Sequence, residues 1–188
     1  MSRVGEKPIE IPAGVTVKTG VNFVEVNGPL GNLKQEVPFG IKVGTQEGKV
    51  LVKRESDVKK IKALHGLIRS LIANMILGVT AGWQKKLEVH GTGYWAKVEG
   101  TDLALSVGFS HLVKIPPPEG IKFQVNENKE ITVSGINKIL VGNVAAKIRK
   151  VKPPNAYKGS GIRYQGEVVK LKPGKAGKAG AAGGGAAS

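Results

Sequence analysis

The sequence predicts an α+β protein with two tandem duplicated domains, each a mostly antiparallel β-sheet packed against one α-helix, followed by a flexible basic C-terminal tail. The first observation is a succession of short strands and one helix that occurs twice. Strand segments 50–52 and 131–133, which precede the two helices, lie 81 residues apart. The second observation is that residues 173–188 contain only Gly, Ala, Lys, Pro and Ser, which cannot bury enough apolar surface to offset their ordering entropy. The predicted domains are therefore 1–82 and 83–172, with a tail at 173–188.

The first half begins with a predicted hairpin. Residues 23–26 and 33–37 are typical of strands, and the intervening residues 27–32 include Asn, Gly and Pro, as turns do. Gly28 and Gly31 also match the Gly-x-x-Gly loop of KH domains, but that loop needs helices on both sides. Because strands flank it here, we interpret it as a hairpin turn. Residues 50–53 are predicted to form another short strand.

A long amphipathic helix should follow this strand. Ser56 and Asp57 are expected to cap its N-terminus, and Gly78 and Gly82 to end it. Arg69 and Asn74 interrupt the apolar stretch 64–77, which is too short to span a bilayer. The apolar face is predicted to contain Ile61, Leu64, Ile68, Leu71, Ile72 and Met75.

The second half repeats this order. Residues 87–89, 94–98, 121–125 and 131–133 are predicted strands, and 99–102 a hairpin turn. Asn137 is expected to cap the second helix. The boundary between the repeats falls near Gly82. Two sets of apolar residues should be buried: Leu103, Leu105, Val107 and Phe109 on a strand, and Leu140, Val144, Ile148 and Val151 on the helix.

The net charge points to a polyanionic partner. The 188 residues contain 29 Lys and Arg against 14 Asp and Glu, which gives +15, and nine of these net charges lie in residues 147–188. Lys and Arg neutralise phosphates and release condensed counterions, so a nucleic acid is the first explanation. An anionic membrane surface is the second and an acidic protein the third. The chain has no cysteine, and residues 1–7 lack the apolar run of a signal peptide, so a cytoplasmic protein is expected.

Enzyme signatures are missing from the sequence. His65, His90 and His111 have no second ligand at zinc-type spacing, and neither a nucleophile elbow nor a Gly-x4-Gly-Lys-Ser/Thr phosphate-binding loop occurs. We therefore expect no catalysis, no metal, no cofactor and no small-molecule substrate.

The segment 150–164 combines the residue types of an RNA-binding surface. Two prolines should stop the helix, while Gly159 and Gly161 let the backbone approach another surface. Tyr157 and Tyr164 could stack on bases, and the neighbouring Lys158 and Arg163 could contact phosphates. The alternative is a solvated basic loop whose tyrosines belong to the core.

At this loop the chain resembles a known family. Residues 153–164, Pro-Pro-Asn-Ala-Tyr-Lys-Gly-Ser-Gly-Ile-Arg-Tyr, are similar to the signature of the bacterial large-subunit ribosomal protein L6 family, and the resemblance covers about residues 1–172. Ser160 departs from the pattern, because a basic residue is common there. The other matching motifs are Ser2-Arg3-Val4-Gly5, Gly28-Pro29-Leu30-Gly31, Leu64-His65-Gly66-Leu67, Gly91-Thr92-Gly93-Tyr94, Gly108-Phe109-Ser110-His111, Val133-Ser134-Gly135-Ile136 and Leu140-Val141-Gly142.

The resemblance implies a non-enzymatic constituent of the large ribosomal subunit. It implies binding to 23S rRNA near the base of the factor-binding stalk and the sarcin–ricin loop, mainly through the C-terminal domain. Neighbouring large-subunit proteins are expected partners, with translation factors nearby. Carried over by position, the rRNA-binding residues would be Arg149, Lys150, Lys152, Tyr157, Lys158, Gly159, Arg163, Tyr164, Lys170, Lys172 and Lys175.

Two other classes of protein share some of these features. A generic basic RNA-binding protein or RNA chaperone would have the same charge without a defined site. A peripheral membrane protein would need a basic amphipathic helix, but the bases of the second helix cluster at its end rather than along one face.

Overall fold

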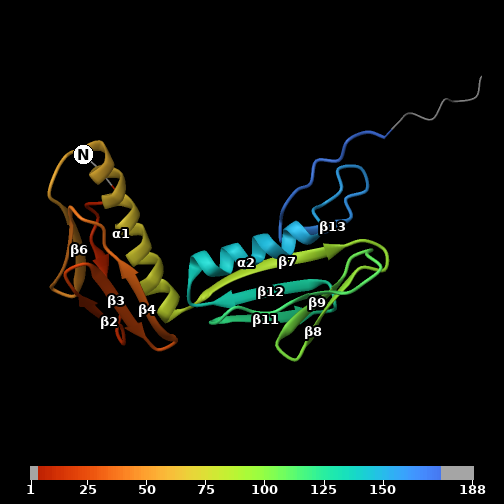
Figure 1. Ribbon diagram of the computed structural model, residues 1–188, viewed down its shortest axis with the longest axis horizontal. Coiled ribbons are helices and arrows are strands. Elements are labelled where there is room, and N and C mark those ends of the chain that lie inside the picture. Colours follow the sequence, from red (N-terminus) through yellow and green to blue (C-terminus); the bar gives the residue numbers. More distant parts are fainter. Residues whose placement is uncertain (1–3, 175–188) are drawn as a thin grey trace, which may run out of the picture.

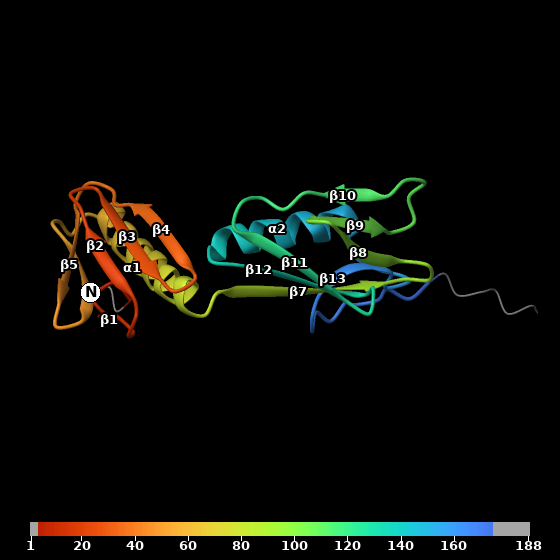
Figure 2. The ribbon, with the colours of Figure 1, turned by 90° about the horizontal axis from the view of Figure 1, so that it is seen from below.

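The chain forms two α+β units joined end to end, as the computed structural model shows for residues 4–174 (Figures 1 and 2). Each unit has its own buried core, built around Val26 and Ile72 in the first and around Leu105 and Ile131 in the second. Within these residues, all strand pairs are antiparallel. The predicted fold class and duplication are confirmed.

In the first unit, helix α1 covers two three-stranded sheets of order β2-β3-β4 and β1-β6-β5. The alternating pattern of β3 directs Val24 and Val26 into the core beneath α1. Gly28 pairs with Gly31 across the β3–β4 turn, so the predicted hairpin is confirmed. The elements are β1 (Ile9–Glu10), β2 (Thr16–Thr19), β3 (Phe23–Gly28), β4 (Gly31–Glu36), β5 (Ile41–Gln46), β6 (Lys49–Arg54) and α1 (Lys59–Thr80).

The predicted start of α1 was wrong, whereas Gly82 ends the helix as expected, because it follows the C-cap residue Ala81 with a φ of +75°. Val58 occupies the N-cap position without a side-chain hydrogen bond, because the Asp57 carboxylate accepts a hydrogen bond from Arg54 Nε at 2.8 Å instead. Gly78 lies inside the helix, which continues to Thr80. The helix has 22 residues and is long and apolar enough to cross a membrane by length and composition, contrary to the sequence estimate. In this fold, its buried face forms part of the first core.

In the second unit, α2 packs against β7, β12 and β13, as Figure 1 shows. These strands belong to a four-stranded sheet of order β11-β12-β7-β13, and a second sheet has the order β10-β9-β8. The elements are β7 (Trp83–His90), β8 (Trp95–Glu99), β9 (Asp102–Ser106), β10 (Val113–Ile115), β11 (Ile121–Asn126), β12 (Glu130–Gly135), α2 (Lys138–Val151) and β13 (Gly161–Tyr164).

In the second unit, the prediction of the helix cap at Asn137 is confirmed, whereas the prediction that Phe109 is buried was wrong. The Asn137 side chain caps α2 by accepting hydrogen bonds from the backbone N–H groups of Ile139 and Leu140, at 3.0 and 3.3 Å. Phe109 was expected to continue the buried face of Leu105 and Val107, but it lies beyond the end of β9 with 43% of its surface exposed.

The two units meet at a close joint. Trp83 Nε1 donates a hydrogen bond to the Asn74 carbonyl oxygen at 3.0 Å, and Lys138 Nζ donates to Asn74 Oδ1 at 3.1 Å. A methyl group on Gly78 would overlap the carbonyl oxygen of Ile136, so α1 and the residues before α2 approach to backbone contact. The boundary at residue 82 stays a prediction.

Candidate nucleic-acid interface

The basic segment that follows α2 lies at the end of the second unit farthest from the joint (Figure 1). Helix α2 ends at Val151, before the two prolines, as expected. The expectation of one irregular loop through residue 164 was wrong, because Gly161–Tyr164 forms β13 on the edge of the sheet. Ile162 is fully buried in the core. The exposed loop is therefore confined to residues 152–160.

Backbone hydrogen bonds hold this loop in one conformation. Asn155 Oδ1 accepts hydrogen bonds from the N–H groups of Tyr157 and Lys158, at 2.7 and 3.1 Å, which forms an Asx turn. The N–H of Asn155 also donates to the Ser160 carbonyl at 2.8 Å. The N–H of Lys172 donates to the Ala156 carbonyl at 2.7 Å, so the chain after β13 is attached to the loop.

The two glycines of the loop have different structural roles. Gly159 has a φ of +70°, which most side chains adopt only with strain. At Gly161 (φ +140°), an added Cβ would lie 2.6 Å from the Pro153 carbonyl oxygen and 2.7 Å from Pro154 Cα. A side chain at residue 161 would therefore separate the loop from β13.

Arg163 is oriented by a carboxylate from the neighbouring strand. It pairs with Glu88 in the β13–β7 register, and its Nε donates to Glu88 Oε2 at 3.3 Å. His90 Nε2 donates to the same oxygen at 2.9 Å. The hydrogen bond from His90, and then that from Arg163, hold the pKa of Glu88 below its ordinary value, against the opposing effect of burial. Two nitrogen donors thus converge on one carboxylate.

An open groove of about 660 Å³ lies beside this cluster. It brings together the predicted residues Lys158, Gly159 and Arg163 with a loop that the site prediction did not include, residues 91–94. The lining residues are His90, Gly91, Thr92, Tyr94, Lys158, Gly159, Ser160, Arg163 and Leu171. Among them Lys158 has no ion-pair partner in the described part of the chain, so its charge faces the groove uncompensated.

The two tyrosines of the segment differ in exposure. Tyr157 is 61% exposed on the loop, where its ring is accessible for stacking. Tyr164 packs against the second core, and its ring lies below Lys85 and Arg149, whose charged groups are 5.3 and 5.6 Å from the ring centroid. Its phenol ring is therefore part of the domain, although its predicted role in binding stays a prediction.

Arg149 is engaged within the protein as well. It forms a bidentate pair with Glu167, with Nε–Oε2 and Nη2–Oε1 distances of 3.1 and 2.5 Å. This pair raises the pKa of Arg149 and lowers that of Glu167, and the Tyr164 N–H adds to the second effect. The charge of Arg149 is thus locally balanced.

Most of the remaining predicted lysines are free of such partners. Lys150, Lys170 and Lys172 are exposed and form no ion pair within residues 4–174. Lys152 extends to the other side of the loop, over the ring of Phe109. Lys175 and the tail after it lie outside the described residues.

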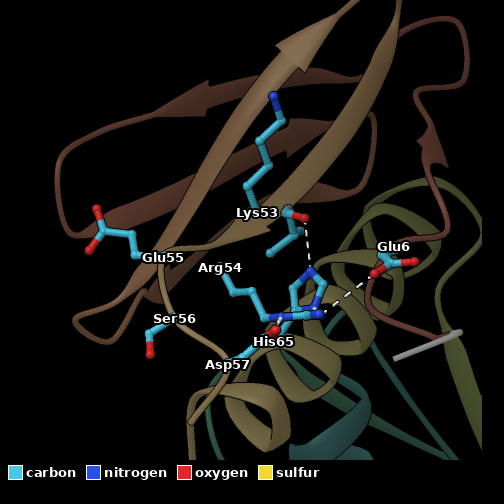
Figure 3. Close-up of a pocket in the computed structure, with 8 residues that line it drawn as sticks. Glu6, Lys53, Arg54, Glu55, Ser56, Asp57 and His65 are labelled. Atoms are coloured by element: carbon cyan, nitrogen blue, oxygen red, sulfur yellow. Dashed lines mark hydrogen bonds and ion pairs between the residues drawn. The ribbon is translucent and has the colours of Figure 1, made fainter. Parts of the chain in front are cut away.

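A second cavity, in the first unit, is of a different kind. This cavity of about 500 Å³ lies at the N-terminal segment of the first unit (Figure 3). Arg54 is directed there toward the carboxylates of Glu6 and Asp57, with nitrogen–oxygen distances of 3.7 and 2.8 Å. Buried His65 donates from Nε2 to the Val52 carbonyl at 2.8 Å and accepts from Arg54 at Nδ1 at 3.3 Å. Because the carboxylates of Glu6 and Asp57 balance the charge of Arg54, this cluster links the N-terminal segment to β6 and α1 and is not a candidate anion site.

Sequence reasoning missed Glu88, His90 and Tyr94 as parts of the site. The motif Gly91-Thr92-Gly93-Tyr94 contains Tyr94 and begins directly after His90, the last residue of β7, so it was the available signal for this part of the site. No group of three or more His, Asp or Glu side chains is placed to hold a metal ion in the part of the chain that the structure describes.

Comparisons with known proteins match both units of the chain. The family model described as ribosomal protein L6 matches residues 11–82 and 90–165, so both units are covered. A protein named large ribosomal subunit protein uL6 from Syntrophomonas wolfei is 52% identical over 177 residues, covering 94% of this chain and 99% of the relative. A protein of the same name from Thermomicrobium roseum is 54% identical over 178 residues, with 94% and 97% covered. One from Synechococcus elongatus is 51% identical over 177 residues, with 94% and 99% covered.

Proposed function

The chain belongs to the ribosomal protein L6 family, whose members are structural, non-enzymatic proteins of the large ribosomal subunit, and from this we propose that its residues 83–172 anchor it on 23S rRNA. The bound region would be that near the base of the factor-binding stalk and the sarcin–ricin loop. Neighbouring large-subunit proteins would complete its surroundings, and translation factors would dock nearby. The proposed location is the cytoplasm, as part of the ribosome.

The observation that carries this proposal is the groove between the loop 152–160 and residues 91–94. Lys158 faces it without an ion-pair partner in the described part of the chain, and Arg163 is held at its wall by Glu88. Exposed Lys150, Lys170 and Lys172 surround the same end of the domain. Residues 147–188 carry nine of the fifteen net positive charges, whereas residues 1–82 carry five. The densest positive charge therefore belongs to the C-terminal segment.

This surface suits recognition of folded RNA by shape and phosphate. A loop fixed by its own hydrogen bonds loses little conformational entropy on binding, and Lys158 can neutralise a phosphate placed in the groove. A rigid loop on a sheet edge cannot enter the deep major groove of A-form RNA, so contacts with phosphates, riboses and unpaired bases are expected. The protein would hold an RNA junction in place without performing chemistry.

The double substitution Lys158→Ala with Arg163→Ala tests the proposal. Binding of the full chain to purified 23S rRNA should weaken, and the slope of log K against log salt should fall by roughly 0.7–0.9 for each phosphate that is no longer neutralised. Affinity would be measured at several salt concentrations, with circular dichroism to confirm that the variant is folded, because Arg163 also pairs with Glu88.

Lys18→Ala with Lys49→Ala provides the matched control. Both lysines are exposed in the first unit and form no ion pair within residues 4–174, so the control removes the same charge far from the groove. Its affinity and salt slope should stay close to those of the natural chain. Equal weakening in both variants, or equally tight binding to unrelated RNA, would instead indicate a generic basic RNA-binding protein.

A further inference from the structure

A second exposed feature lies at the same end of the second domain, in the loop between β9 and β10. The rings of Phe109 and His111 are stacked in nearly parallel planes. Their centroids are 5.9 Å apart, and the interplanar angle is 16°. Neither ring belongs to the core: 43% of Phe109 is exposed, and His111 is exposed as well. The two rings form an offset aromatic surface that faces solvent.

A cation accompanies this aromatic surface. Lys152 Nζ, from the C-terminal end of α2, lies 4.8 Å from the centroid of the Phe109 ring. No carboxylate pairs with Lys152 among residues 4–174. Because Lys152 begins the loop whose Lys158 and Gly159 line the groove, one short segment contributes to both features.

The loop that carries the rings is held in place by the domain. Val107, directly before it, is fully buried in the core. Gly108 has a φ of +77°, and the hydroxyl of Tyr94 lies 2.9 Å from where its Cβ would be, so only glycine fits this turn. The rings are therefore presented by a fixed turn, and little entropy is lost when a ligand contacts them.

Flat rings beside an unpaired ammonium group have the features needed to bind one nucleotide. An aromatic face stacks on a base of any sequence, and the adjacent cation neutralises its phosphate. Phe39 of the first unit is even more exposed, at 94%, but no ring or cation is stacked on it in the described part of the chain. Exposure alone thus does not produce this arrangement.

We propose that Phe109 and His111 form a stacking platform for one unpaired base of the bound RNA, with Lys152 at the adjoining phosphate. The proposal rests on the proposed function, because it adds a second contact to the same RNA. It explains why an aromatic residue stands at a position that the domain core does not use. A stacked base also fixes the direction of the strand, which phosphate contacts alone do not.

The test compares Phe109→Ala, Phe109→Leu and Phe109→Tyr in the full chain, with purified 23S rRNA as the probe. Stacking is not an ionic contact, so Phe109→Ala should weaken binding roughly 5- to 160-fold, the range for removal of one stacked base, with the salt slope unchanged. Phe109→Tyr should restore affinity, whereas Phe109→Leu, which keeps apolar bulk without an aromatic face, should not. Ultraviolet crosslinking of the natural complex should join a nucleotide to the peptide containing Phe109.

Phe39→Ala is the matched control and should bind like the natural chain. If Phe109→Ala also binds like the natural chain while Lys158→Ala with Arg163→Ala does not, the proposed base stacking is wrong. The proposed binding of phosphates in the groove is then still supported. Full rescue by Phe109→Leu would likewise overturn stacking, because apolar packing would then suffice. Failure of the natural chain to bind the rRNA would overturn the proposed function itself.

Discussion

At the scale of single residues, Glu88 links the charge state of the candidate site to the stability of the domain. Its carboxylate accepts hydrogen bonds from His90 and Arg163, which lower its pKa in the folded protein below the ordinary value of 4.5. A carboxyl group whose folded pKa is lowered stabilises the fold above its unfolded pKa, and this contribution is lost as the pH falls through the folded pKa.

We therefore predict a smaller acid sensitivity for Glu88→Gln than for the natural chain. The difference in unfolding free energy between the two should be largest above about pH 4.5 and should shrink below it. Urea unfolding at a series of pH values would measure this. Glu119→Gln, an exposed residue without an ion pair among residues 4–174, should give no such difference. A constant gap between Glu88→Gln and the natural chain at all pH values would contradict the argument.

At the scale of elements, the two helices begin in different ways. Asn137 satisfies two backbone N–H groups of α2, whereas Val58 satisfies none of those of α1 by its side chain. Asn137→Ala should therefore lower the unfolding free energy by about 0.5–2 kcal/mol. Asn143→Ala, at an exposed position inside α2, should be neutral or slightly stabilising because alanine favours the helix interior. Thermal or chemical unfolding would measure the unfolding free energy of both variants. Equal values would contradict a stabilising role of Asn137 as the cap of α2.

Local patterns predicted those elements whose signals are local. Alternation indicated β3 and β9, and Asn137 marked the start of α2. The start of α1 was misplaced because the Asp57 side chain is taken by Arg54, a competition that the capping pattern does not contain. Strands β1, β2, β5 and β10 were not predicted, since they are short or largely exposed and lack a continuous apolar face.

The candidate site depends even more on contacts that local sequence patterns do not contain. Residue types alone singled out Lys158, Gly159 and Arg163, and the fold brings these three to one groove. The strand nature of β13 was missed because its pairing partner β7 lies more than seventy residues earlier, where Glu88 faces Arg163. Contacts between such distant segments depend on the completed sheet, so no local pattern in either segment indicates them.

At the scale of the whole molecule, the joint between the domains depends on the absence of one side chain. Gly78→Ala should separate α1 from Ile136, because the added methyl group meets a backbone oxygen that cannot rotate away. The distance between spin labels on the two domains should change or broaden, while each core stays folded. Gly142→Ala provides the control: it lies in α2 with nothing within 4 Å of its Cβ position, so it should leave the distance unchanged. An unaltered distance in Gly78→Ala would contradict a joint fixed by backbone contact.

The position of β13 as the last strand within residues 4–174 has a consequence for synthesis. Its partner β7 is made early, but the sheet edge and the loop fastened to it by Lys172 are completed only when the final part of the chain is available. The surface proposed to bind RNA is therefore completed only after most of both cores has been synthesised.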